Sequence, residues 1–187
     1  MLFLANPAIR DIVRRNFDKT GRSGLRSHWN LRFRRHGRII LAEWLPNIIH
    51  DDGEEWIAKV VFSEAQAVGA NYYIGLDART TLAEADDLAA LVSEPSAGGY
   101  ARQAVASDAT DFTVTQVGGD WQAKTKTVTF TASGGNFGTL KNAFLTDKDV
   151  ATTGKFLIAS VALSADRTIN DGDSLDVDLT FPIKEAA

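Results

Sequence analysis

Alternating apolar and polar positions dominate the chain after residue 70 and predict a series of short β-strands. In "TKTVTFT" the threonines alternate with Lys126, Val128 and Phe130, which is the period of a half-buried strand. Further strands are predicted in "YYIGL", "GYARQAVA", "FTVTQV", "KNAFLT", "GKFLIASVAL" and "DSLDVDLTFPI". Gly-, Asn- and Asp-rich turns separate them. Six or seven short strands at this spacing predict a mainly β protein, an antiparallel β-sandwich of immunoglobulin-like or jelly-roll-like type.

The segment before these strands mixes the two periods. Trp29, Leu31 and Phe33 alternate with polar residues, and "RIILAEWL" follows after Gly37, so a β-hairpin is expected here. The stretch "DDGEEWIAKVVF" predicts a helix that Asp51 or Asp52 caps. Its expected buried face consists of Trp56, Ile57, Val60 and Val61.

A second helix is expected near the start of the chain. Asn6 is a suitable N-cap and Pro7 suits the first helical position. One face is apolar, and the glycines of "KTGRSG" end the helix as a flexible joint. The apolar face consists of Ile9, Ile12, Val13 and Phe17. The expected organisation is a basic arm over 1–38, a connecting strand and helix over 39–70, and a β-sandwich over 71–187.

Charge is distributed unevenly between these parts. The chain has a net charge of −4, but residues 1–38 carry +8 and the remainder carries −12. Such asymmetry predicts an interaction arm on a separate body. The candidate partner-binding residues are the basic residues and one aromatic of this arm: Arg10, Arg14, Arg15, Phe17, Arg32, Arg34, Arg35 and Arg38.

Three interpretations of the arm remain open. The arginines suit an acidic protein surface, including another copy of the chain, because the guanidinium group pairs with carboxylates bidentately. Contact with nucleic-acid phosphates is the second interpretation, which the acidic body disfavours. A solvated arm without a target is the third. We favour protein docking.

Enzymatic chemistry has no positive support in the sequence. The chain contains no cysteine and only His28, His36 and His50, so a zinc site is not expected. Phosphate-binding glycine motifs and a G-x-S-x-G motif are not present. Catalytic residues, cofactors and metals are therefore predicted as none. No apolar run approaches the roughly 20 residues that span a bilayer, so no membrane partner is expected.

Two features have sharper alternatives. The aspartates of "INDGDSLDVD" are oxygen ligands that calcium prefers, but the EF-hand spacing is not present. Asp176 and Asp178 are expected to face solvent from one side of a strand. Trp44, Trp56 and Trp121 are expected to be core anchors, with a carbohydrate-binding platform as the alternative.

Several motifs occur together in one order. "PNIIHDDGEEWIAKVVF", "YYIGL", "EPSAGGYARQAVA", "KTKTVTFTASGG", "NAFLTD" and "SVALSADRTINDGDSLDVDLTF" follow one another between Ile40 and Ile183. This ordered set resembles small virion structural proteins of tailed bacteriophages. The resemblance implies a β-sandwich subunit assembled on a capsid, neck or tail, either as a decoration or cement protein or as a neck–tail accessory. Other virion proteins and copies of the chain would be its partners. A homo-oligomer in the virion, made in the cytoplasm of the host bacterium, is expected.

Overall fold

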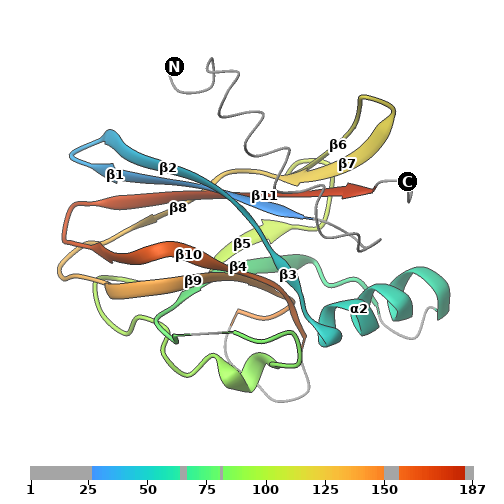
Figure 1. The fold of residues 1–187 in the computed structure, drawn as a ribbon, viewed down its shortest axis with the longest axis horizontal. Helices are drawn as coiled ribbons and strands as arrows, with labels where there is room; N and C mark the ends of the chain where they lie inside the picture. Colours follow the sequence, from blue (N-terminus) through green and yellow to red (C-terminus); the bar gives the residue numbers. More distant parts are fainter. Residues whose placement is uncertain (1–26, 64–66, 81, 150–155, 184–187) are drawn as a thin grey trace.

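Two antiparallel β-sheets lie face to face in the computed structural model, which describes residues 27–63, 67–80, 82–149 and 156–183 (Figure 1). The predicted mainly β sandwich is confirmed. Its core lies between the sheets and contains Trp29, Phe130, Leu140, Val161 and Leu179, all less than 3% exposed. The helix predicted near Asn6 lies outside the described residues.

The first sheet, sheet A, has β11 (Ser174–Ile183) at its centre. On one side of β11 lie β1 (His28–Arg35) and then β2 (Arg38–Pro46). On the other side, β8 (Val128–Thr131) pairs with the first half of β11 and β7 (Asp120–Thr125) with the second half. The strand β6 (Phe112–Val117) pairs with β7 and forms the far edge.

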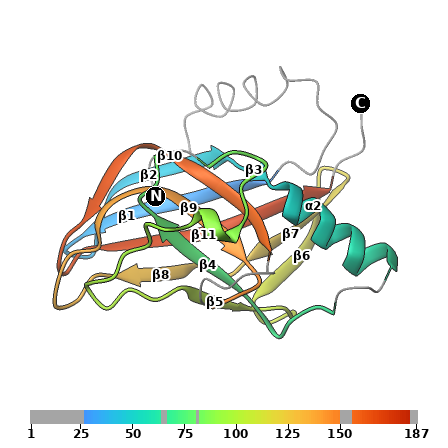
Figure 2. The ribbon, with the colours of Figure 1, turned by 90° about the horizontal axis from the view of Figure 1, so that it is seen from below.

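The second sheet, sheet B, contains the remaining strands. Their order is β3 (Ile48–Ile49), β10 (Leu157–Ile169), β9 (Gly138–Thr146), β4 (Asn71–Asp77) and β5 (Gln103–Ala106). The helix α2 (Asp51–Ala58) packs against β10 at one end of the sandwich, as Figure 2 shows from below. It continues as the π-helical turn η2 (Lys59–Ser63), and a short 3₁₀ helix, η3 (Leu88–Ala90), follows β4.

The predicted hairpin is present, and it is part of the sandwich. His36 and Gly37 form its two-residue turn with positive φ angles of 48° and 76°, as tight antiparallel connections require. The alternating apolar residues of β1 all point into the core, where Trp29 and Leu31 are fully buried. The strand that was expected to belong to an arm is therefore an inner strand of sheet A.

The predicted helix is confirmed, but its N-cap residue and the exposure of Val61 differ from the prediction. His50, with extended backbone, is the N-cap, and Asp51, Asp52 and Glu54 lie in the first turn, where the helix dipole favours acidic groups. Trp56 is buried, and Ile57 and Val60 pack partly against the core. Val61, which was predicted to be buried, is 61% exposed. The π-helical turn after Ala58 changes the angular spacing of side chains and carries Val61 away from the core.

The run "TKTVTFT" is divided between two strands instead of forming the single strand predicted. The break at Lys126 and Thr127 lets β7 and β8 pair with successive halves of β11. Thr125, the last residue of β7, is buried and accepts a hydrogen bond from the Leu179 backbone N–H at 3.0 Å. Alternation alone does not reveal such a break, because both strands have the same period.

Close packing of α2 against β10 gives a first prediction. A Cβ atom on Gly53 would lie 2.9 Å from Cα and the carbonyl carbon of Ile158, inside van der Waals contact. We expect Gly53→Ala to lower the free energy of unfolding by about 1–3 kcal/mol, because overpacking forces backbone shifts. Urea denaturation measures the change. Gly69→Ala is the matched control, since its Cβ would meet only the Asn71 oxygen at 3.5 Å. Equal effects of both variants would contradict the packing argument.

Candidate functional site

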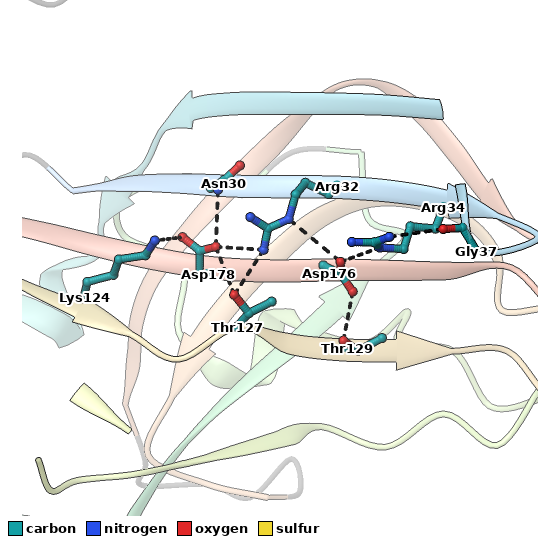
Figure 3. A network of polar contacts seen from close by, with 9 residues as sticks. All are labelled: Asn30, Arg32, Arg34, Gly37, Lys124, Thr127, Thr129, Asp176 and Asp178. Atoms are coloured by element: carbon teal, nitrogen blue, oxygen red, sulfur yellow. Dashed lines mark hydrogen bonds and ion pairs between the residues drawn. The ribbon is translucent and has the colours of Figure 1, made fainter. Parts of the chain in front are cut away.

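The outer face of sheet A holds a cluster of ion pairs between β1 and β11 (Figure 3). Antiparallel pairing places Arg32 opposite Asp176 and Asn30 opposite Asp178. Because side chains alternate along a strand, the same register sends the apolar residues of both strands inward and these polar residues outward. We call Arg32, Arg34, Arg35, Lys124, Asp173, Asp176 and Asp178 the arginine–aspartate cluster.

Asp178 is the most enclosed member of the arginine–aspartate cluster. Its side chain is 1% exposed, and two cations contact it from different strands. Arg32 Nη2 lies 3.1 Å from Oδ2, and Lys124 Nζ lies 3.1 Å from Oδ1. Asn30 Nδ2 donates a further hydrogen bond to Oδ2 at 3.3 Å. These contacts supply both carboxylate oxygens with donors, as a buried charge requires.

Asp176 and Asp173 complete the cluster toward the hairpin turn. Arg34 Nε contacts Asp176 Oδ2 at 2.6 Å, and Thr129 Oγ1 donates to Asp176 Oδ1 at 2.9 Å. Arg35 Nε lies 3.3 Å from Asp173 Oδ2. Arg34 also donates to the Gly37 carbonyl at 3.2 Å, which ties the turn to the cluster.

Burial is unequal between the two kinds of charge. The aspartate side chains are 1–10% exposed, whereas the arginine side chains that cover them are 24–51% exposed. The expectation that Asp176 and Asp178 face solvent was wrong, although they do lie on the outer face. The sequence does not show that β1 pairs with β11, because the two strands lie far apart in the chain. The arginine partners of these carboxylates could therefore not be predicted.

This arrangement neutralises charge within the chain. Three aspartates face three arginines and one lysine, so most of the positive charge on β1 already has a partner. Among the described residues, no group of three or more His, Cys, Asp or Glu side chains is arranged to hold a metal ion. The chemistry that the cluster performs is structural: it joins the outer faces of β1, β11 and β7.

The candidate arm residues therefore divide into three sets. Arg32, Arg34 and Arg35 belong to the arginine–aspartate cluster. Arg38 is exposed at the start of β2, opposite Arg35. Arg10, Arg14, Arg15 and Phe17 lie outside the described residues. Their role in partner binding stays a prediction.

His50 is a buried titratable residue whose environment the sequence did not indicate. Its Nδ1 lies 3.1 Å from the Glu84 carbonyl oxygen, so Nδ1 carries the proton and donates it. Its Nε2 accepts from Ser160 Oγ at 2.8 Å. Burial lowers the pKa of His50 below its ordinary value of 6.5. His50 and Ser160 are at most 1% exposed, so this pair joins the loop before η3 to β10 and cannot meet a substrate.

The tryptophans do not form a common platform. Trp56 is buried as expected, but Trp44 and Trp121 are 50% and 53% exposed. Trp44 pairs with Asn30, on the outer face of sheet A, whereas Trp121 pairs with Ile183, on the core-facing side. Two exposed rings on opposite faces do not make the flat aromatic surface that the carbohydrate-binding alternative requires.

No helix within the described ranges is long and apolar enough to span a membrane.

Comparison with known proteins gives the class of the protein. The β-sandwich fold and the ordered motifs both agree with a structural component of a bacteriophage virion. The profile of the family described as Podophage GP4 fiber I protein gp80 matches residues 53–180, about two thirds of the chain, and the chain belongs to this family. It is a phage fibre protein, a structural component of the virion, and membership implies a non-enzymatic role. Searches of curated proteins and of solved structures gave no match.

Removal of a guanidinium group from the arginine–aspartate cluster should destabilise the fold. We expect Arg32→Met to lower the free energy of unfolding by about 1–3 kcal/mol, because Asp178 stays buried with fewer donors. Arg38→Met is the control. It removes the same charge from an exposed position, where about 0.5 kcal/mol or less is expected. Chemical denaturation at fixed ionic strength measures both. An effect of Arg38→Met as large as that of Arg32→Met would show that net charge alone matters.

The lowered pKa of His50 predicts a pH dependence of stability. The unfolded chain binds a proton below about pH 6.5, while folded His50 stays neutral until a lower pH. The unfolding free energy should therefore decline as pH falls from 7.5 toward 5. Asp52, whose pKa burial raises, acts in the opposite sense, so the comparison with a variant isolates His50.

Thermal unfolding of His50→Asn should show lower stability at pH 7.5 and a smaller decline toward pH 5. His36→Asn, in the exposed hairpin turn, should keep the decline of the unmodified protein. An unchanged pH dependence in His50→Asn would contradict the assignment.

Proposed function

We propose that this fibre protein docks onto other virion proteins through the basic segment that precedes β1. Neutralisation within the arginine–aspartate cluster is the observation that carries the proposal. Because Arg32, Arg34 and Arg35 already have partners within the fold, we assign docking to the positive charge of residues 1–26. This segment has a net charge of +4, and the rest of the chain has −8. Arg10, Arg14 and Arg15 are the residues to which we assign partner contact.

Of the two predicted positions in the virion, the neck–tail accessory role receives more support than capsid decoration. The support is the family description, which names a fibre protein and not a capsid protein. In this role the sandwich is the rigid body, and the basic segment is its connection to an acidic neighbour. Several copies arranged by symmetry would each bury a modest interface, and simultaneous contacts would raise the total affinity.

The nucleic-acid alternative receives less support from the described residues. Phosphate contact needs unpaired cations, and three of the candidate arginines contact buried aspartates instead. A steep loss of DNA binding with added salt would be its signature.

Incorporation into particles tests the docking proposal. We expect the triple variant Arg10→Ala, Arg14→Ala and Arg15→Ala to fold normally but to be lost from purified virions, as quantitative mass spectrometry would measure. The matched control changes Lys19, Arg22 and Arg26 to alanine. It removes the same charge from residues in or just after the predicted glycine joint and should retain incorporation. Normal incorporation of the first variant would contradict the proposal.

A further inference from the structure

The core-facing side of sheet A extends beyond the part that sheet B covers. The last covered layer is an aromatic series in which Trp56 contacts Tyr72 and Tyr72 contacts Phe112, with ring centroids 5.4 and 5.7 Å apart. Past Phe112 the apolar residues on this side become exposed: Val114 is 62% exposed, and Ile183 is also 62% exposed. In Figure 1 the hairpin of β6 and β7 reaches beyond the sandwich.

Strand register shows that these exposed residues form one surface. Ile183 pairs with Trp121, and Ala123 pairs with both Phe181 and Val114. Directly paired residues share a face of a sheet, and alternation along β11 places Phe181 and Ile183 on the same side as buried Leu179. We call this surface the apolar end of sheet A; it consists of Val114, Trp121, Ala123, Phe181 and Ile183. A contiguous apolar surface of this kind indicates an interaction site.

The strand β1 begins beside this surface. His28, the first residue of β1, pairs with Thr180, three residues before Ile183. Within the described residues, the β1 side of β11 is therefore unpaired from Phe181 to Ile183. Ser27, where the described part of the chain begins, lies at this corner of the sandwich.

The sequence of that segment supplies a complementary apolar face. Ile9, Ile12, Val13 and Phe17 recur at helical spacing, and the arginines of the predicted helix fall largely elsewhere, with Arg10 at the border of the apolar face. About ten residues connect the predicted helix to β1, a length that spans at most about 30 Å when extended. This length exceeds the distance along β11 from Thr180, which pairs with the start of β1, to Ile183. The connection is therefore long enough for the segment to reach the apolar end of sheet A. The charges also suit each other, at +4 for the segment and −8 for the rest.

We propose that the N-terminal segment folds back as an amphipathic helix and packs its apolar face on the apolar end of sheet A of its own chain. Val114, Trp121 and Ile183 are the contacts from the sandwich, and Ile12, Val13 and Phe17 are the contacts from the segment. Packing in this direction assigns Phe17 to the internal contact, leaves Arg14 and Arg15 facing outward, and places Arg10 at the edge of the contact. Only the destination of these arginines depends on the proposed function; the internal contact stands independently of it.

The covalent connection favours the chain's own segment over that of a second copy. A short flexible joint gives the attached segment an effective concentration in the millimolar range. An isolated helix of this length is marginal in water, so it needs an apolar surface to order it.

Cross-linking of the full-length protein tests the proposal, because the chain contains no cysteine. Ile12→Cys is combined either with Val114→Cys, on the apolar end of sheet A, or with Ala42→Cys, an exposed position on the outer face. A short bis-maleimide is applied to dilute protein, and products are separated on a denaturing gel. We expect an intramolecular product with Val114→Cys, formed roughly tenfold faster than with Ala42→Cys.

Each other result overturns the proposal. A cross-linked dimer would assign the surface to a second copy, and equal or negligible rates at both positions would mean that the segment does not dock there.

Limited trypsin cleavage after Arg14 and Arg15 gives a second measurement without cysteines. Trp121→Gln should accelerate this cleavage roughly tenfold, because it opens the docked segment. Trp44→Gln, an equally exposed tryptophan on the other face, should leave the rate unchanged. Equal rates in the two variants would contradict the docking. Both measurements use the isolated protein, so they remain valid even if particle incorporation fails for another reason.

Discussion

Pairing between β1 and β11 is the constraint on which the rest of the structure depends. It inserts Trp29 and Leu31 into the core on one face and brings Arg32 and Arg34 over buried aspartates on the other. Neither face is stable without the other. A one-residue slip would send tryptophan and leucine into solvent and leave the aspartates buried among apolar side chains. The two kinds of interaction therefore specify one register together.

Period-two patterning was sufficient to predict the sandwich and most of its strands, because strands such as β1 and β8 alternate between buried and more exposed residues. It also predicted the hairpin with Gly37 in its turn. What the pattern did not contain was pairing. "TKTVTFT" has an unbroken period, yet it supplies parts of two strands because β11 is long enough to hold both. Val61 was misplaced for a local reason, since a π-helical turn changes side-chain direction without altering apolar spacing.

At the candidate site, too, the sequence shows the charge pattern but not the pairing of the strands. An excess of arginine before residue 38 indicated an acidic partner, and for Arg32, Arg34 and Arg35 that partner is the chain's own β11. Both charge patterns are visible in the sequence, but their meeting across sheet A is a tertiary fact. For a fibre protein this distinction matters, because charge used within the fold does not contribute to assembly. The exposed apolar end of sheet A was equally hidden: Trp121 looks like a core residue until the limit of sheet B is known.

The separation of β1 and β11 in the sequence also affects the order of folding during synthesis. Asn30 and Asp178, which bond across the two strands, are 148 residues apart. Contacts of such long range fold slowly, because the entropy of closing the loop is lost before the contact forms. At a synthesis rate of roughly 5–20 residues per second, β1 waits on the order of ten seconds before its partner leaves the ribosome. During that interval β1 can pair with β2, but its alternating tryptophan, leucine and phenylalanine are not yet covered by the second sheet. Charged residues between the apolar positions of an unpaired strand disfavour its association with other chains, and Arg32 and Arg34 occupy such positions in β1.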